Sequence, residues 1–345
     1  MTMPDVTIMG AGVFGLTLAL ACRERGARVQ VTEARGIGAG SSGGLVGALA
    51  PHVPENWNAK KALQFDALRM AQDYWHRVQE ISGIDPGYAR LGRVQPVPDG
   101  GLELARGRAA GADDLWQGFA QWHVLPVAEA PGLAMHAPSG WVIHDTLSAR
   151  LHPRRAGQAL AGAFQALGGK IVFGTAEPRG KIVWATGYEG LEALSTALGR
   201  KIGGGVKGQS LLLRHDARAA PQLFADGLHI VPHADGTIAI GSTSERDFDS
   251  PDSVDAQCDA LHARALAICP ALQGAPVIAR WAGVRPRARS RAPLLGPWPG
   301  RAGQYVFNGG FKIGFAMAPA LAQIMADLVL DGIDRVPRDF GFGAV

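Results

Sequence analysis

The chain opens with a short apolar run that leads directly into a glycine-rich turn. Val6–Met9 has the composition of a strand buried in a parallel sheet. A helical pattern of apolar positions follows and stops at Gly26, a residue typical of helix ends. Residues 28–32 form a second expected strand, which leads into Glu33. The pattern therefore predicts a β-α-β unit with an acidic residue after its second strand.

The turn between the first strand and the helix has the spacing Gly-x-Gly-x-x-Gly. Gly10 permits a tight turn, Gly12 lets the backbone approach a pyrophosphate, and Gly15 lets helix and strand pack closely. The helix N-terminus offers free N–H groups to that pyrophosphate. Glu33 would accept hydrogen bonds from a ribose hydroxyl. We therefore expect this unit to bind a dinucleotide whose adenosine lacks a 2′-phosphate.

Strand and helix patterns continue through the rest of the chain. Leu228–Pro232 and Thr237–Gly241 flank an Asp-Gly pair at 235–236, which predicts a β-hairpin with a type I′ turn. The other expected elements are an amphipathic helix through Leu68, Ala71, Trp75 and Val78, a helix over 153–167, strands at 171–173 and from Lys181, and β-rich segments at 92–97, 141–143 and 206–214.

The order of these elements predicts an α/β fold with about two domains. We expect residues 1–88, 145–205 and 282–345 to form a discontinuous, doubly wound domain of the Rossmann type. Residues 89–144 and 206–281 are expected to form a substrate domain on a mixed or antiparallel sheet.

Composition and charge narrow the class of protein. Of the 345 residues, 47% are hydrophobic and 19% are charged, which is enough for a large core. The net charge of +4 is spread along the chain, so no nucleic-acid partner is expected. Cys22, Cys258 and Cys269 match no metal or disulfide pattern, and we expect no apolar stretch as long as a membrane span. These features predict a soluble, cytoplasmic protein without a metal site.

A long glycine- and serine-rich stretch follows Glu33, whereas in NAD-binding domains the next helix normally starts soon. Composition alone favours a flexible surface loop. Residues 35–52, however, resemble the loop of the D-amino-acid oxidase superfamily that wraps the FAD pyrophosphate and passes under the flavin. Glycine oxidases have a similar Ser-x-x-x-Gly-Gly-x-Leu-Ala-Pro run at this point.

Later segments resemble the same superfamily in matching order. They are the Ala-Thr-Gly at 185–187, the Trp-Ala-Gly-x-Arg-Pro type motif at 281–286, the Pro-x-x-Gly at 293–296 and the Gly-Phe-Lys turn before an apolar C-terminal helix. The resemblance implies FAD as the cofactor. The flavin-linked cysteine of sarcosine oxidases has no evident counterpart here, so we expect non-covalent FAD.

The resemblance also implies which residues contact FAD, with the N-terminus of the last helix near the flavin ring. The expected contacts are Gly10, Gly12, Val13, Phe14, Gly15, Glu33, Ala34, Arg35, Ser41, Ser42, Gly43, Gly44, Leu45, Ala185, Thr186, Gly187, Gly283, Arg285, Gly309, Gly310, Phe311, Lys312 and Ile313.

Four residues are candidates for contact with substrate. Arg285 matches the arginine that binds the substrate carboxylate in glycine oxidase-like proteins, and a guanidinium can do so with a bidentate fork. Lys312 resembles the lysine of sarcosine oxidases and would assist Arg285 or stabilise reduced flavin. His229 lies where similar glycine oxidases have a tyrosine, and it could accept the amine's proton. His52 follows the glycine-rich loop and is expected near the flavin.

The surroundings of Arg285 depart from the family pattern. An Asp often follows the Arg-Pro pair, but Ser290 stands here among Arg287, Arg289 and Arg291. This excess of positive charge is compatible with a diacid or phosphorylated substrate, or with a cluster that only faces solvent.

Together these features predict an FAD-dependent oxidase or dehydrogenase of a small amine or amino acid, such as glycine, an N-alkyl glycine or a D-amino acid. A hydride would pass from the α-carbon to flavin N5, and the resulting imine would hydrolyse. Oxygen or a quinone or other electron carrier would reoxidise the flavin. The alternatives are a 2-hydroxy acid or modified RNA base as substrate, and a flavin-binding module without activity.

Overall fold

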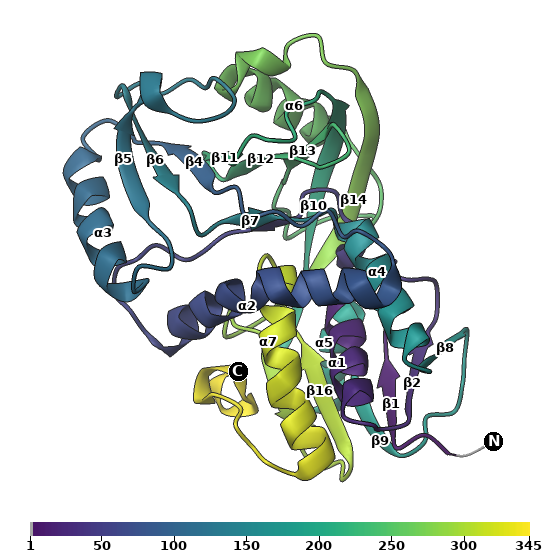
Figure 1. The fold of residues 1–345 in the computed structure, drawn as a ribbon. Coiled ribbons are helices and arrows are strands. Elements are labelled where there is room, and N and C mark those ends of the chain that lie inside the picture. The colour runs from purple at the N-terminus through teal and green to yellow at the C-terminus, as the bar shows by residue number, and fades with distance from the viewer. Residues whose placement is uncertain (1–2) are drawn as a thin grey trace.

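The computed structural model describes residues 3–345 as two stacked halves, each built around one large sheet (Figure 1). The lower half contains the N-terminal strand and the long C-terminal helix, and the upper half contains strands from the middle of the chain. The chain crosses between the halves several times. Segments far apart in sequence therefore meet where the halves join.

The lower sheet has six strands and the expected doubly wound character. Its order is β15-β16-β9-β1-β2-β8, and every neighbouring pair is parallel except β15 and β16. This sheet confirms the expected α/β fold class. Its strands are β1 (Val6–Met9), β2 (Val29–Glu33), β8 (Lys170–Phe173), β9 (Lys181–Trp184), β15 (Leu294–Pro297) and β16 (Gln304–Asn308).

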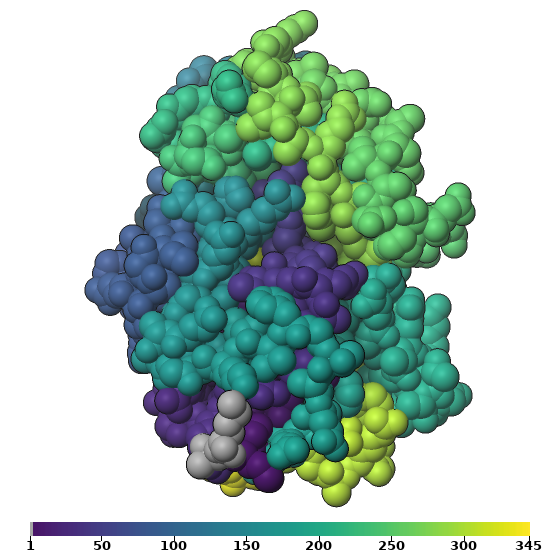
Figure 2. All heavy atoms as spheres, turned by 90° about the vertical axis from the view of Figure 1, so that its right-hand side faces the viewer, coloured from purple at the N-terminus to yellow at the C-terminus, as the bar shows by residue number. Residues whose placement is uncertain are grey.

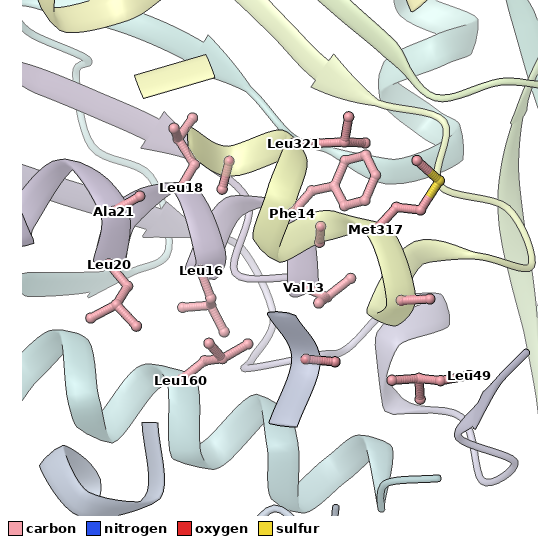
Figure 3. Packing of buried hydrophobic residues seen from close by; sticks show 14 of the residues in the cluster. Val13, Phe14, Leu16, Leu18, Leu20, Ala21, Leu49, Leu160, Met317 and Leu321 are labelled. Atoms are coloured by element: carbon pink, nitrogen blue, oxygen red, sulfur yellow. The ribbon is translucent and has the colours of Figure 1, made fainter. Parts of the chain in front are cut away.

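Helices cover this sheet through apolar side chains. In Figure 3, Phe14 of α1 points toward Met317 and Leu321 of α7, while Leu16 faces Leu160 of α4. These contacts join the first helix of the chain to the last, because burial of apolar surface drives their packing. The helices are α1 (Val13–Glu24), α2 (Ala59–Ser82), α4 (Pro153–Ala166), α5 (Gly187–Ala197) and α7 (Gly314–Ala326).

The C-terminal helix differs from expectation in one respect. With its last turn at Asp327–Asp331, the helical segment Gly314–Asp331 has the length and apolar composition of a membrane span, with mean hydropathy 1.3. In this fold 56% of it is buried, and α7 packs against both α1 and α2. Burial in the protein core accounts for its apolar character.

The upper sheet has eight strands in the order β14-β10-β13-β12-β11-β4-β6-β5. It is the expected mixed sheet, because β11 and β4 are parallel whereas the other neighbours are antiparallel. Its strands are β4 (Arg93–Pro96), β5 (Trp122–Pro126), β6 (Trp141–Asp145), β10 (Gly203–Arg214), β11 (Gln222–Ala225), β12 (Leu228–Pro232), β13 (Thr237–Gly241) and β14 (Val277–Ala288).

The remaining elements lie outside the two large sheets. The helix α6 (Ala256–Ile268) contacts β10 and β13, and α3 (Leu102–Leu115) contacts β5. A small sheet joins β3 (Ala48–Leu49) to β7 (Ala149–Arg150). The sequence pattern missed α3, because that helix buries only Ala105 and Ala112 and so has little apolar periodicity.

The expected hairpin has the predicted strand bounds, but its turn is not type I′. The N–H of His233 donates to the carbonyl of Thr237 (2.7 Å), so the loop has three residues, and of the Asp-Gly pair only Gly236 has a positive φ (+81°). The proposed domain division remains a prediction. Most strands of each sheet come from the segments assigned to it, but β14 runs across the proposed boundary at residue 282.

Candidate functional site

A cavity of about 690 Å³ lies between the two sheets and is lined from both of them. At one end are the glycine turn after β1 and the end of β2. At the other are strands of the upper sheet and the turn before α7. Figure 2 shows a face on which early (purple), middle (teal) and late (yellow-green) segments of the chain meet. The cavity therefore collects residues that are remote in sequence.

The end of the cavity near β1 has the features of a dinucleotide site. Glu33 accepts hydrogen bonds from the backbone N–H groups of Ala11 (2.8 Å) and Arg35 (2.9 Å). Its carboxylate is thus held beside the glycine turn, where a ribose hydroxyl could reach it. The hydroxyl of Ser42 accepts a hydrogen bond from the backbone N–H of Val13 (3.0 Å), at the first turn of α1. This helix end is the expected site for a pyrophosphate.

Two glycines explain how the turn fits against its neighbours. Gly10 has φ +109°, and a Cβ atom there would lie 2.5 Å from the carbonyl oxygen of Ala185. A Cβ at Gly15 would lie 1.9 Å from the carbonyl oxygen of Gly10. Side chains at either position would collide with backbone, so both need glycine. Gly15 does not line the cavity; it serves the close packing of helix and strand.

Both halves of the molecule hold the glycine-rich loop, here residues 36–47. From the upper sheet, His233 Nε2 lies 2.9 Å from the carbonyl oxygen of Leu45. From the lower half, Arg154 Nε donates to the carbonyl of Gly43 (2.9 Å), and the N–H of Leu151 donates to Gly47 (3.0 Å). These contacts fix the loop between the two sheets, so it is an ordered wall of the cavity.

The turn before α7 is tied to the other cavity segments. The side-chain amide of Asn308 donates to the carbonyl of Gly187 (2.8 Å), which joins the Ala-Thr-Gly segment to this turn. The rings of Phe14 and Phe307 are stacked with centroids 4.4 Å apart. The N–H of Phe311 donates to the carbonyl of Pro286 (3.0 Å), near the end of β14. The turn therefore lies at the junction of α1, α5 and β14.

Arg285 lines the cavity, and most of its hydrogen-bonding groups are already engaged. Its Nη1 donates to Ser242 Oγ (2.5 Å), and its Nη2 donates to the carbonyls of Lys207 (3.1 Å) and Thr243 (2.7 Å). The guanidinium lies against Gly208, where a Cβ would come within 2.5 Å of Nη2. Its buried Nε has no hydrogen-bond partner among residues 3–345. Both terminal nitrogens of the expected fork, Nη1 and Nη2, thus donate hydrogen bonds to protein oxygens.

A buried polar network lies behind Arg285. Lys207 and Glu245 form an ion pair at 3.8 Å, and both are almost fully buried. Gln209 Nε2 donates to Glu245 (3.2 Å) and to Asp255 (2.8 Å), while the Thr243 hydroxyl donates to Glu245. Burial lowers the pKa of Arg285 to about 10, and the charge of Glu245 acts in the opposite direction. Arg285 therefore remains a cation at neutral pH.

Lys312 brings a second cation to the cavity. Its Nζ lies 5.8 Å from the centroid of the Phe311 ring. The guanidinium carbons of Arg285 and Arg287 lie 5.6 and 5.5 Å from the same ring. Burial lowers the pKa of Lys312, and the charges of Arg285 and Arg287 lower it further. The cavity wall at Phe311 therefore carries a concentration of positive charge.

His229 also lines the cavity, from the hairpin strand β12. Its ring packs on Phe224 with centroids 4.5 Å apart, and Arg93 lies over the far side of that cluster, 5.5 Å from the Phe224 ring. Burial lowers the pKa of His229 to about 3, with further contributions from Arg93 and Lys312. The imidazole is therefore neutral at ordinary pH, and the ordinary histidine pKa behind its expected role as a base does not apply.

His52 lies outside the residues that line the cavity. Its ring Nδ1 contacts Gln64 Oε1, and its backbone N–H donates to the same oxygen (2.8 Å). Gln64 is buried in α2 and also donates to the carbonyl of Ala50 (3.1 Å). His52 therefore fastens the chain that leaves the glycine-rich loop to α2.

Most of the expected cofactor and substrate residues do line this one cavity. The exceptions are Gly15, Gly43, Gly309, Ile313 and His52. Sequence reasoning missed several other lining residues: Val46, Tyr188, Ser210, Ser242, Trp281 and Asn308. Trp281 is the first residue of the motif at 281–286, and Ser242 directly follows the predicted hairpin. Their positions next to predicted features could have indicated that both residues line the cavity.

The residues present fit FAD. The cavity joins a glycine turn and helix N-terminus, suited to a pyrophosphate, to the N-terminal end of α7, which has no side-chain cap. Gly10 adds no side chain to this wall, and a Cβ there would lie 2.5 Å from the carbonyl oxygen of Ala185. Glu33 supplies the ribose acceptor, and Val46, Trp281 and Phe311 supply apolar surface.

Comparison with known proteins places the chain in a family. Residues 5–328 match the family described as FAD dependent oxidoreductase. A glycine oxidase of Pseudomonas aeruginosa is 28% identical over 359 residues, which cover 94% of each chain. The bifunctional protein ThiO/ThiG of Trichormus variabilis is 27% identical over 95% of this chain. The chain spans about half the length of that protein, 53%.

A solved structure gives the same result for the fold. The glycine oxidase of Geobacillus kaustophilus superposes with a TM-score of 0.84, covering 99% of this chain and 98% of that chain, at 22% identity. The fold and the site thus define a flavoenzyme. The chain belongs to the FAD-dependent oxidoreductase family of the D-amino-acid oxidase type, and its cofactor is FAD.

Proposed function

We propose that this enzyme oxidises a small amine or amino acid, such as glycine, an N-alkyl glycine or a D-amino acid. The observation that carries this proposal is Arg285, a cation that lines the cavity and is held there by hydrogen bonds to Ser242, Lys207 and Thr243. A carboxylate is the natural partner of a guanidinium at a cavity wall. The glycine oxidase relatives support the same substrate class.

In this proposal the α-carboxylate lies against the guanidinium of Arg285. Ser242 and the carbonyls of Lys207 and Thr243 hold the guanidinium in place, so little side-chain freedom is lost when substrate binds. A non-covalently bound FAD would supply the oxidant for removal of a hydride from the α-carbon, which Arg285 would hold in place. The resulting imine then hydrolyses in water.

The charge on the cavity wall also bears on the amine. Arg285 is a cation and His229 is neutral, while burial and the charges of Arg285 and Arg287 lower the pKa of Lys312. Such a wall favours an uncharged amine over an ammonium ion, because like charges repel. A neutral His229 would contact the amine by hydrogen bonding and would not store its proton. The apparent Michaelis constant should therefore fall as pH rises toward the amine's own pKa.

Anaerobic reduction of the flavin tests the proposed function. Purified holoenzyme would be mixed without oxygen with glycine, sarcosine, D-alanine and the matching 2-hydroxy acids, glycolate and D-lactate. Bleaching of the flavin by amines alone supports the proposal, whereas bleaching by the hydroxy acids alone contradicts it. Reoxidation by oxygen or by an artificial quinone then separates an oxidase from a dehydrogenase.

Substitution of Arg285 tests the anchor itself. Arg285→Met should raise the Michaelis constant for an amino acid by about 100-fold, because the substrate carboxylate loses a charged partner. Retained yellow flavin would show that the variant still folds. An unchanged Michaelis constant in a variant that keeps its flavin would rule out Arg285 as the carboxylate anchor.

A further inference from the structure

The cavity wall around Phe311 carries more positive charge than a single carboxylate can balance. Three cationic groups, from Arg285, Arg287 and Lys312, lie within 5.5 to 5.8 Å of the centroid of this one ring. Phe311 and Lys312 both line the cavity. Cations gather around an aromatic face by attraction to its π-system, but they still repel one another.

The backbone holds these cations together. Arg285 and Arg287 are two residues apart on β14, so their side chains leave the same face of the sheet. A β-bridge between Arg287 and Gly310, with the hydrogen bond from Phe311 N–H to Pro286, attaches the turn that carries Lys312 to the end of β14. The positive charges are therefore fixed in place by the fold.

Acidic residues of the protein do not neutralise this group. Glu245 lies near Arg285, but it is already paired with Lys207 at 3.8 Å. Among residues 3–345, no carboxylate oxygen lies within 4.0 Å of the charged nitrogens of Arg287 or Lys312. By contrast, Arg35, at the other end of the cavity, does pair with Glu189 at 3.4 Å.

A charge count indicates what the site is missing. An α-carboxylate on Arg285 would balance one of the three cations, and the negative charge of reduced flavin would balance a second. One positive charge is still left beside Phe311. A monocarboxylate amino acid has no group to place there, whereas a substrate with a second carboxylate does.

We propose that the preferred substrate is an amino acid with two carboxylates, the second of which is bound by Lys312 with Arg287 as the adjacent supporting charge. This inference rests on the proposed function and specifies its substrate class. Arg287 does not itself line the cavity, so its charge acts from beside Lys312 and Phe311.

Inert ether analogues test the charge preference without any turnover. Methoxyacetate and oxydiacetate have the shapes of sarcosine and iminodiacetate, differ by one carboxylate, and cannot form an imine. Their dissociation constants for the holoenzyme would be measured by calorimetry and by the change in flavin absorbance. We expect oxydiacetate to bind at least about 10-fold more tightly than methoxyacetate, because its second carboxylate makes one additional charged contact. Equal or weaker binding of oxydiacetate overturns the proposal.

Two arginine variants locate the effect. Arg287→Gln should reduce the ratio of the two dissociation constants by about threefold, because Arg287 supports Lys312 and does not itself line the cavity. Arg289→Gln is the matched control, because Arg289 is exposed and lies one strand period farther along the chain; it should keep the wild-type ratio. A ratio that survives Arg287→Gln, or that falls equally in both variants, overturns the assignment.

Measurements of turnover distinguish a failure of this inference from a failure of the proposed function. Iminodiacetate and D-aspartate should show a higher kcat/KM than sarcosine and D-alanine, from which they differ by one carboxylate each. If the monocarboxylates reduce the flavin as well as the dicarboxylates do, the substrate class is wrong but the function stands. If no amine of either kind reduces the flavin, the proposed function itself fails.

Discussion

The two ends of the cavity are built in different ways. At the cofactor end, the wall is mostly backbone, from Gly10, Gly12 and the N-terminus of α1. The carboxylate of Glu33 accepts a hydrogen bond there from the N–H of Ala11, only 22 residues away in the chain. At the substrate end, the wall is made of side chains. Arg285 reaches across the sheet to Ser242 and Lys207, 43 and 78 residues away.

This difference bears on what each end can tolerate. Backbone that must pass within 3 Å of other backbone admits few alternatives, so the cofactor end depends on a small number of glycines. The substrate end depends on charge and on hydrogen bonds among exchangeable side chains. It can change specificity while the fold and the FAD site are retained.

The largest expected effect comes from adding a single methyl group at the cofactor end, which tests whether this end depends on close backbone contact. Gly10→Ala should abolish FAD retention and lower the free energy of unfolding by about 3 kcal/mol, because it combines a positive φ with a Cβ 2.5 Å from Ala185. The flavin content of the purified protein and its urea midpoint measure the two effects.

Gly36→Ala is the matched control for that variant. Gly36 lies in the same region, but an added Cβ there meets no atom within 4 Å. This variant should keep both flavin and stability. A yellow, stable Gly10→Ala protein would show that the cofactor end does not depend on close backbone contact.

Sequence reasoning succeeded where structure is determined locally. The glycine turn, the acid at Glu33 and the Asp-Gly hairpin each lie within a short stretch, and each takes its expected place. Their residue types permit only a few backbone geometries, so local sequence carries most of the information. The order of the lower sheet follows from the same β-α-β logic.

The substrate end was less predictable because it depends on long-range register. Which residues face Arg285 is decided by the pairing of β10 with β14 and by the segment after β13, and no local pattern shows this. The sequence also could not give the burial that lowers the pKa of His229 to about 3. His52 shows a further limit, since closeness in sequence to the glycine-rich loop did not place it in the cavity.

Acid sensitivity offers a second, intermediate test at the substrate end. The pKa of His229 falls from 6.5 to about 3 on folding, so below pH 6.5 the unfolded chain binds a proton that the folded protein does not. The stability that neutral His229 preserves at neutral pH is therefore lost as pH falls from 6.5 toward 3. At pH 5 this loss is about 2 kcal/mol.

The variant His229→Phe should remove that part of the pH dependence. Urea unfolding at pH 7 and pH 5 measures it, and His76→Phe, at an exposed position of α2, should retain the wild-type difference. The Michaelis constant of His229→Phe for substrate should rise about 10-fold through loss of a hydrogen bond. If instead the variant loses a titration from its pH–rate profile, His229 acts as a base, and the neutral state assigned to its imidazole is wrong.

The smallest expected effect concerns His52, which lies next to the glycine-rich loop without lining the cavity. His52→Ala should lower the free energy of unfolding by about 1 kcal/mol, because Gln64 loses one hydrogen-bond partner but keeps its contacts with the backbone of residues 50 and 52. Turnover of the flavin-loaded variant should change by less than about threefold, since fastening of the loop to α2 is a stability effect. A loss of turnover far beyond this, at full flavin content, would place His52 at the substrate end and extend the side-chain wall across the cavity.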